Sequence, residues 1–340
     1  MNPKLLILAL SGKVKGIEDP FERRRILTLM EFQQELINGV VNYRPASERV
    51  EINDKATKKI FALPVETFDS MMNGVAPTID EAKIKGKVIK SQVRLALEEE
   101  KLIKFDAPLQ ALDEFDRAVM AACVSEIAAG NSFSTINVIY RNLTGKIGRG
   151  DAEPTKNQIE MIKRSLIKMN ALTITLDYSN CMEVLNGAKF TTRDLTGSIL
   201  PCQIMQGEIN GKSTTILKFL DKIPLYLVAQ AKKQILTYDG RLLDIPNQSN
   251  TPMNIMVKNH TIRRVMEIIS HKELAPTIKF ISAFKNCRIL GKDNKIKQRA
   301  RETMIELFEH LKENRIITSF SVAKDGNTFD SIKFKFKSKK

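Results

Sequence analysis

Apolar residues after position 110 recur at helical spacing in three consecutive segments and then alternate. In the first segment they return every three or four positions, which places them on one buried stripe of a helix. Ser134 or Thr135 is suited to cap the second helix, and Thr155 is suited to cap the third. The stretch that follows alternates and is rich in β-forming residues, as half-buried strands are. The pattern predicts helices at 112–129, 134–143 and 155–169 and a strand at 171–178.

The same order recurs towards the end of the chain. Helical patterns are followed by two strand-like stretches that flank Asp325-Gly326, a dipeptide typical of a β-hairpin turn. The predicted elements are helices at 251–270, 275–284 and 293–312 and strands at 316–322 and 331–337. Apolar residues of the two stretches pair at an offset of 145, as in Met120 and Val265, Ile136 and Ile281, and Ile162 and Leu307. One offset across these elements indicates two copies of one supersecondary plan.

The first copy is extended beyond its strand. Residues 199–206 and 214–219 are predicted to form a hairpin, and a helix at 223–235 is predicted to link the two copies. The turn at 207–213 contains glycine, lysine and serine, as phosphate-binding loops do. Three residues lie between its glycines instead of four, and no helix follows it, so we interpret it as a hairpin turn.

Three helices followed by a hairpin are the plan of the winged helix, a helix-turn-helix variant. Its third helix enters the DNA major groove, and its hairpin, the wing, contacts the neighbouring backbone or minor groove. Two copies predict a helix-dominated α+β protein with tandem winged-helix domains. The charged amphipathic stretches 20–38 and 88–102 predict a mainly helical region before them. The predicted domains are 1–110, 111–250 and 251–340.

Basic residues are concentrated in the last of these domains. The formal net charge is +15, and residues 251–340 hold 20 basic and 9 acidic side chains, which is +11 of that total. A positive field of this size in one domain favours a polyanionic partner. Double-stranded DNA is the expected partner, and an acidic membrane surface is the alternative.

The third helix of the second copy has its basic residues in its first half and its acidic residues in its second half. Lys295 and Arg299 lie one turn apart, as do Lys297 and Arg301, so the members of each pair share a face. The first half of a recognition helix meets the groove, where arginine can bind guanine at two atoms and lysine contacts phosphates. We therefore predict DNA contacts here, with Lys292 just before the helix. A salt-bridged surface helix is the alternative.

The wing and the first copy supply further candidate contacts. In residues 332–337 lysines alternate with apolar residues, so a strand would carry all its lysines on one face. Lysines that protect an edge strand from aggregation would give the same pattern. The predicted wing contacts are Lys324, Lys333, Lys335 and Lys337. The first copy is predicted to carry a weaker basic surface made of Lys146, Arg149, Lys156, Asn157, Lys163 and Arg164.

Several other classes of protein are disfavoured. The four cysteines form no Cys-x-x-Cys pair and the three histidines do not cluster with them, which predicts neither a zinc site nor disulfides. The first apolar run has six residues, too few for a signal peptide, and no stretch approaches the roughly 20 needed to cross a bilayer. No sign of catalysis or of a cofactor motif is present. A cytoplasmic, non-enzymatic protein without metal or cofactor is predicted.

The chain resembles the replication initiator proteins of plasmids and related mobile elements, which carry two winged-helix domains and bind repeated sites at an origin. The resemblance rests on the paired arrangement over residues 111–337, on Phe115-Asp116-Arg117-Ala118-Val119 opening the first copy, and on the basic helix and wing of the second. It implies sequence-specific duplex binding, opening of the origin and recruitment of host replication proteins such as a helicase or its loader. A homodimer is compatible with it. A transcriptional regulator or DNA-organising protein is the nearest alternative, and an enzyme acting on nucleic acid is a more distant one.

Overall fold

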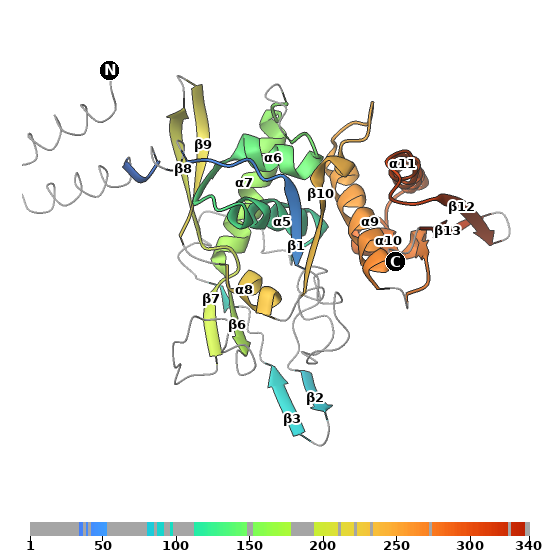
Figure 1. The fold of residues 1–340 in the computed structure, drawn as a ribbon, viewed down its shortest axis with the longest axis horizontal. Helices are drawn as coiled ribbons and strands as arrows, with labels where there is room; N and C mark the ends of the chain where they lie inside the picture. The colour runs from blue at the N-terminus through green and yellow to red at the C-terminus, as the bar shows by residue number, and fades with distance from the viewer. Residues whose placement is uncertain are drawn as a thin grey trace, which may run out of the picture.

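The computed structural model describes residues 34–36, 39, 42–52, 80–84, 87–91, 96–97, 112–147, 152–177, 194–209, 212–220, 223–231, 234–271, 274–325 and 328–336. Within them the chain is a mixture of helices and strands, and the helices hold the larger share. Figure 1 shows two groups of helices, the first in green and the second in orange to red, with strands attached to each. The predicted α+β class with dominant helices is confirmed.

The first group, which we call the first unit, has the order helix, strand, helix, helix, strand, strand. Its elements are α5 (Glu114–Ala128), β5 (Phe133–Thr135), α6 (Ile136–Thr144), α7 (Lys156–Ala171), β8 (Cys202–Ile209) and β9 (Lys212–Phe219). The strands form an antiparallel sheet in the order β5-β9-β8. Strands β6 (Leu172–Asp177) and β7 (Asp194–Ser198) are inserted before the hairpin and pair with each other. The three predicted helices, the strand after them and the hairpin are confirmed.

The second unit has the same order without the insertion. Its elements are α9 (Pro252–Ser270), β11 (Thr277–Lys279), α10 (Phe280–Asn286), α11 (Asn294–Glu313), β12 (Ser319–Asp325) and β13 (Thr328–Lys335). Its sheet has the order β11-β13-β12, which matches the sheet of the first unit strand for strand. The sequence predicts neither β5 nor β11, because three residues are too few to establish a period of two. The predicted helix at 275–284 begins only after β11.

The repeat is confirmed as an order of elements but not as one constant offset. Strand β5 begins at residue 133 and β11 at residue 277, 144 positions later. The buried side chains of α7 recur in α11 142 positions later: Ile162, Ser165, Leu166 and Met169 correspond to Met304, Leu307, Phe308 and Leu311. Ile281, the predicted counterpart of the buried Ile136, is therefore 53% exposed. Connections of different length cause the drift, and frequent apolar residues conceal it in the sequence.

Hydrogen-bonding side chains define where five of these helices begin. The capping residues are Asp113, Thr135, Thr155, Thr251 and Asp293 for α5, α6, α7, α9 and α11. Each accepts a hydrogen bond from an N–H group in the first turn, which has no partner within the helix. In α11, Oδ1 of Asp293 accepts from the N–H of Ile296 at 2.8 Å. The caps predicted at Thr135 and Thr155 are confirmed.

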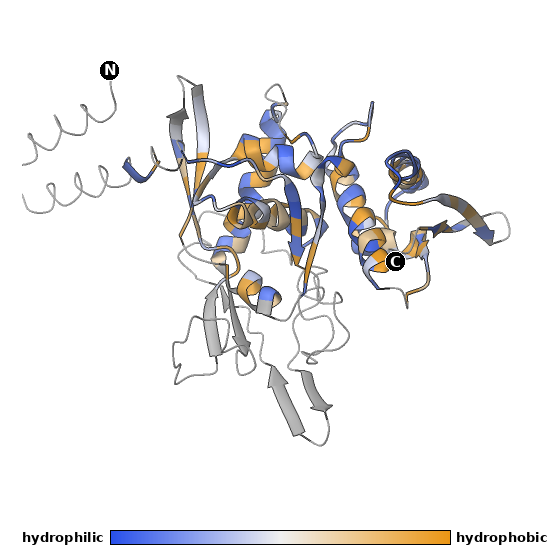
Figure 2. Ribbon diagram, in the orientation of Figure 1, coloured by the Kyte–Doolittle hydropathy of each residue, from blue (hydrophilic) through white to orange (hydrophobic). Residues whose placement is uncertain are grey.

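Each unit has its own apolar core, and helix α9 contributes to both. Ile255 of α9 packs in the core of the first unit, whereas Val257 packs in the core of the second. In the second core the ring of Phe308 on α11 lies 5.6 Å from Phe320 and 5.4 Å from Phe334, both on the hairpin. Figure 2 shows the matching alternation of hydrophobic and hydrophilic stripes along the helices. Helix α9 is therefore a structural element shared by the two units.

The segment between the two units is not the single helix predicted at 223–235. Helix α8 (Pro224–Ala231) ends early, strand β10 (Ile235–Asp239) follows, and a short 3-10 helix, η2 (Gly240–Leu243), precedes α9. Strand β10 pairs antiparallel with β1 (Glu48–Ile52), which comes from far earlier in the chain. Pairing with a distant strand overrides the local helical pattern here.

The described residues between 80 and 97 are strands, which corrects the helix predicted at 88–102. Strand β2 (Asp80–Ile84) pairs with β3 (Lys87–Ser91), and β4 (Ala96–Leu97) pairs with β6. The mainly helical character predicted for the N-terminal region is therefore wrong for these residues and for β1. Residues 34–36 are helical, and the rest of the helix predicted at 20–38 lies outside the described residues. The domain boundaries at 110 and 250 stay predictions.

Candidate nucleic-acid interface

Helix α11 presents a polar stripe on the side opposite its core contacts. Lys295, Gln298, Arg299 and Glu302 are all exposed, and their spacing of three, four and seven places them on one face. The opposite face is buried and consists of Ala300, Thr303, Met304, Leu307, Phe308 and Leu311. The predicted helix therefore lies at the surface, with its basic first half directed outwards. Lys292 is also exposed, in the turn before the cap.

The basic groups at the start of α11 are not neutralised within the described part of the chain. Lys292, Lys295, Lys297 and Arg299 have no carboxylate within ion-pair distance there. The acidic groups further along the helix are hydrogen-bonded to neutral amides instead. Glu302 Oε1 accepts from Gln298 Nε2 at 2.9 Å, and Glu306 Oε2 accepts from Gln248 Nε2 at 2.6 Å. The salt-bridged surface helix that competes with DNA binding is therefore not the arrangement described.

Arg301 differs from the other basic residues of α11 because it contacts the neighbouring helix. Its guanidinium carbon lies 5.3 Å from the ring centroid of Phe284 on α10, and the side chain is half-buried. A cation over an aromatic face is stabilised electrostatically and loses conformational freedom. Arg301 is thus oriented by α10, and its replacement would disturb the packing of α10 on α11 as well as remove a charge.

The lysines of strand β13 lie on the far side of the sheet from α11. Lys333 and Lys335 are exposed, whereas Ile332 and Phe334 are buried, so the predicted alternation is present. Because Phe334 packs on Phe308 of α11, the lysines between these apolar residues point away from that helix. Lys324 is exposed near the tip of the hairpin, and Lys337 lies outside the described residues. Their contact with DNA stays a prediction.

The basic surface predicted for the first unit is smaller than the one on α11. Lys156, Asn157 and Arg164 are exposed on α7. Lys163 forms an ion pair with Glu160 one turn earlier, at 3.2 Å, and Lys146 is half-buried. Arg149 lies outside the described residues. These residues therefore form no stripe comparable to that of α11, and their contact with DNA also stays a prediction.

Gln298 is a candidate contact residue that the sequence analysis does not include. It lies between Lys295 and Glu302 on the exposed stripe, and its amide is held by Glu302. Glutamine can form two hydrogen bonds with adenine in the major groove. A search of the sequence for charged residues does not find Gln298, because its side chain is neutral. Its spacing of three residues from Lys295 is the signal in the sequence that could have identified it.

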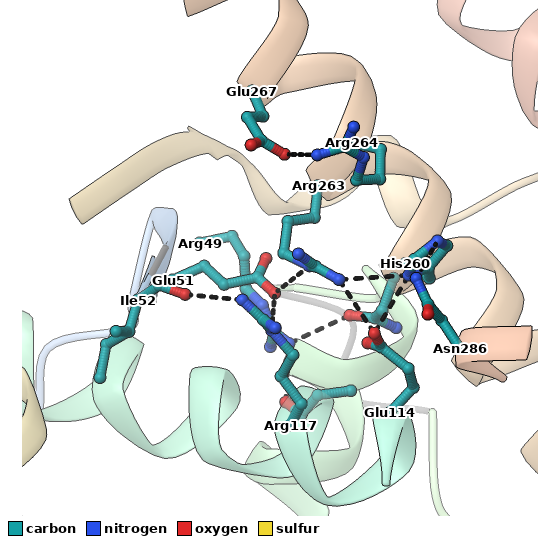
Figure 3. Close-up of polar contacts among 12 residues, drawn as sticks. Arg49, Glu51, Ile52, Glu114, Arg117, His260, Arg263, Arg264, Glu267 and Asn286 are labelled. Carbon is teal, nitrogen blue, oxygen red and sulfur yellow. Dashed lines mark hydrogen bonds and ion pairs between the residues drawn. The ribbon is translucent and has the colours of Figure 1, made fainter. Parts of the chain in front are cut away.

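A second group of polar side chains is buried between the two units (Figure 3). Glu114 of α5 accepts a hydrogen bond from Nη2 of Arg263 on α9 at 2.9 Å, and its Oε1 lies 3.1 Å from Nδ1 of His260. The side chains of Glu114 and Arg263 are 2% and 3% exposed. We use the name interunit charge cluster for Arg49, Glu51, Glu114, Arg117, His260 and Arg263. The cluster lies at the contact of α5 with α9.

Arg49 of β1 connects three helices within this cluster. Its Nη2 donates to the carbonyl of Ala118 on α5 at 2.7 Å and to Oδ1 of Asn259 on α9 at 3.0 Å. Its Nη1 donates to the carbonyl of Asn142 on α6 at 3.3 Å. Arg49 is 1% exposed, so these neutral acceptors replace water around its charge.

Glu51 of β1 is shared between the two units. Its Oε1 lies 3.7 Å from Nε of Arg117 on α5 and 3.6 Å from Nε of Arg263 on α9. Its Oε2 accepts from the hydroxyl of Tyr238 on β10 at 3.2 Å. Arg117 also donates to the carbonyl of Ile52 at 3.0 Å. Strand β1 therefore connects α5, α9 and β10 through the side chain of Glu51.

Burial raises the pKa of both Glu51 and Glu114, whereas neighbouring positive charges lower it. Burial alone would raise the pKa of Glu114, but the charge of Arg263 and the hydrogen bond with His260 outweigh it, and the pKa falls to about 2. Burial raises the pKa of Glu51 above its usual value despite Arg263, Arg117 and Arg49. Burial also lowers the pKa of His260, so the imidazole is neutral at pH 7. The pair of Glu114 with Arg263 is the principal ion pair of the cluster.

The buried side chain of Lys258 is expected to make the stability of the protein depend on pH in the alkaline range. Its Nζ donates to the carbonyl of Leu243 at 3.0 Å and to Oδ1 of Asn250 at 2.9 Å. Burial lowers its pKa from 10.5 to about 8, so the folded protein holds the proton less tightly than the unfolded chain does. We therefore expect the contribution of Lys258 to the free energy of unfolding to rise from pH 8 to pH 10.5. The rise should be roughly 3 kcal/mol.

The measurement is urea denaturation at a series of pH values for the protein and for a Lys258→Met variant. Other groups of the chain also respond to pH, so the quantity of interest is the difference between the two proteins. That difference should change steadily from pH 8 to 10.5. A constant difference across this interval would contradict the prediction.

Other site chemistry is limited in the residues that the structure describes. Cys123, Cys202 and Cys287 are buried, and Cys181 lies outside those residues. Burial raises the pKa of the Cys123 and Cys287 thiols, which disfavours the reactive thiolate. No three His, Cys, Asp or Glu side chains are grouped there as metal ligands would be. None of the described helices has the length and apolarity of a membrane span.

Comparison with known proteins gives one likeness in structure. No protein-family model matches the chain, and no curated protein matches it. Among solved structures, the chain is similar to the Pi initiator protein in complex with iteron DNA. The TM-score is 0.33 and the sequence identity is 14%, and the match covers 65% of this chain and 91% of that chain.

Proposed function

We propose that this chain is a sequence-specific binder of double-stranded DNA with two winged-helix units. The support is the order helix, strand, helix, helix, hairpin in both units. In each unit the short strand between the first two helices pairs with the second strand of the hairpin. In a winged helix this order exposes the third helix for insertion into the major groove. The observation that carries the proposal is the exposed stripe of Lys295, Gln298 and Arg299 at the start of α11.

The residues of this stripe have distinct roles in the proposed complex. Arg299 is suited to bind guanine at O6 and N7, and Gln298 is suited to bind adenine at N6 and N7. Lys292 and Lys295 are suited to neutralise phosphates at the edges of the groove. Helix α7 of the first unit enters a second groove, and it contributes fewer positive charges than α11 does. Most of the binding free energy then comes from the second unit, and it depends strongly on salt.

The biological role that we propose is initiation of replication of a plasmid or mobile element at repeated origin sites. Its support is the resemblance over residues 111–337 to initiators with paired winged-helix domains. The protein then acts by opening the origin and recruiting host replication proteins, and it performs no catalytic step. On this proposal the purified chain neither hydrolyses ATP nor cleaves duplex DNA.

The test begins with selection of binding sites from a library of random 40-base-pair duplexes by the full-length chain. We expect one enriched sequence whose affinity exceeds that of a scrambled duplex by at least about 10³-fold. Absence of any enrichment would contradict sequence-specific binding. Exchange of Gln298 for alanine should relax the base preference at one position with an unchanged salt slope. Exchange of Lys295 for alanine should lower affinity for all sequences and reduce the slope by about one.

A second experiment separates initiation from transcriptional regulation. Copies of the selected site, placed in an array beside an AT-rich segment, are cloned into a plasmid that has no other origin. An initiator supports replication of this plasmid only when the protein is supplied. Protection of a promoter without any replication would favour the regulator.

A further inference from the structure

We propose that the interunit charge cluster is a positioning device that holds the two units in a single relative orientation. Six charged or titratable side chains at the contact of α5 with α9 would then do more than support the fold. They would set the distance and angle between α7 and α11. The importance of this for DNA rests on the proposed function, whereas the fixed orientation itself can be tested without DNA.

Directional contacts distinguish this interface from an ordinary contact between apolar helices. Apolar surfaces tolerate small shifts, because dispersion forces and burial have little directionality. Buried ions gain little net stability over apolar side chains, but each of their hydrogen bonds has a required geometry. Arg49, Glu51, Glu114 and Arg263 are each at most 3% exposed, so water cannot replace a partner that moves away. The cluster therefore penalises any other arrangement of the two helices.

The residues of the cluster are shared between units rather than confined to one. Glu51 lies between Arg117 of the first unit and Arg263 of the second, at 3.7 and 3.6 Å. Glu114 of the first unit binds His260 and Arg263 of the second. A shift of α9 by one residue moves each side chain by about 1.5 Å along the axis and turns it by roughly 100°. Such a shift would leave Glu114 buried without Arg263, and it would leave Arg117 as the only one of these two arginines beside Glu51.

Strand β1 fixes the positions of α5, α6 and α9 relative to one another. Figure 3 shows the side chains of Arg49 and Glu51 entering the cluster from β1, across from Arg117 on α5 and Arg263 on α9. Arg49 bonds to α5, α6 and α9 together. Because β1 is also paired with β10, the connection before α9 is fixed by the same strand. Residues 48–52 thus act on both units although they lie before either of them in the chain.

A fixed orientation has a direct consequence for a duplex that contacts both units. Grooves suited to α7 and to α11 lie at one spacing along the helical repeat of about 10.5 base pairs. An insertion of half a turn rotates one groove to the opposite side of the duplex. A rigid protein loses one of its two contacts there, whereas a flexible pair of units keeps both.

The first test measures the orientation without DNA. Spin labels are attached to cysteines placed at Glu160 on α7 and Glu309 on α11, both exposed, in a chain that carries Cys181→Ser. The remaining cysteines, Cys123, Cys202 and Cys287, are buried. Pulsed electron resonance should give one narrow distance distribution for the parent chain. The double variant Arg49→Met with Glu51→Gln should give a distribution at least twice as broad, or a second maximum.

The controls separate positioning from a general loss of structure. Glu48→Gln changes the exposed first residue of the same strand, and it should leave the distribution unchanged. Tyr238→Phe removes only the hydroxyl that donates to Glu51, so it should broaden the distribution while the circular dichroism spectrum stays native. A broad distribution in the parent chain would overturn the proposal. An equally narrow distribution in the double variant and in Tyr238→Phe would overturn it as well.

The second test measures the consequence on duplexes selected by the parent chain. Insertion of five base pairs between the two contacted grooves should lower parent affinity at least about 30-fold, and insertion of ten should restore part of it. Tyr238→Phe should bind the uninserted duplex about as well but lose less than about 10-fold on the five-base-pair insertion. Equal losses in both proteins would overturn the role in DNA binding. If no duplex is selected at all, the proposed function fails, and the resonance measurement still decides the role of the cluster.

Discussion

Replacement of Lys295, Lys297 and Arg299 by alanine is expected to weaken binding of the selected duplex at least about 100-fold at physiological salt. The three side chains lie in the first half of α11, and no carboxylate neutralises them in the described part of the chain. Each lost phosphate contact also removes about one unit from the slope of log affinity against log salt. Fluorescence anisotropy at several salt concentrations measures both quantities, and the midpoint of urea denaturation should change little.

Helix α11 itself offers the matched control. Lys312 is the same residue type as Lys295, is also exposed, and lies at the opposite end of the helix. Lys312→Ala should therefore leave affinity and salt slope nearly unchanged, whereas Lys295→Ala alone should reduce both. Arg301 is left intact in the triple variant because its contact with Phe284 would confuse binding with packing. Equal effects of the two lysine substitutions would exclude the start of α11 as the binding surface.

Replacement of Arg263 by leucine is expected to lower the free energy of unfolding by about 3–5 kcal/mol. The substitution removes the guanidinium that contacts Glu114 at 2.9 Å and Glu51 at 3.6 Å, and both carboxylates stay buried. Loss of a counter-charge costs more than the pair itself contributes, because the remaining charge cannot reach water. Urea denaturation followed by circular dichroism measures the change.

Two comparisons test the physical reason for that loss. The double variant Arg263→Leu with Glu114→Leu removes a buried charge of each sign, and it should be more stable than Arg263→Leu alone. Lys163→Gln breaks a more exposed pair, with Glu160, and should have little effect on stability. If Arg263→Leu were no more destabilising than Lys163→Gln, the ion pairs of the cluster would not constrain the folded state.

The order of elements in both units could be predicted because local signals agree there. Capping residues such as Thr135 and Asp293 stand at the start of helices whose apolar stripes have a clear period. Strands β10 and β3 could not be predicted. Each is five residues long, and each is defined by a partner elsewhere in the chain, β1 and β2 respectively. Where the partner supplies the stability, the local pattern of a segment carries little information.

The candidate interface could be predicted only in part for a related reason. The outward direction of Lys295 and Arg299 follows from the helical period, so the sequence is sufficient for it. Alternation in β13 also follows from sequence, but the side of the sheet on which Lys333 lies depends on where Phe334 packs. The interunit charge cluster is not predicted at all. Its contacts include Glu51 with Tyr238, 187 positions apart, and no short-range pattern encodes such a distance.

The pairing of β1 with β10 has a consequence for how the chain acquires its structure during synthesis. Strand β1 leaves the ribosome long before β10, and the α9 residues that neutralise Glu51 emerge later still. Contacts between such remote positions form slowly, because a large loop must close before they contribute. Until then the side chains of Glu51 and Arg49 are solvated, and charged side chains on an unpaired strand disfavour aggregation. The cluster can therefore be completed only after α9 has been made.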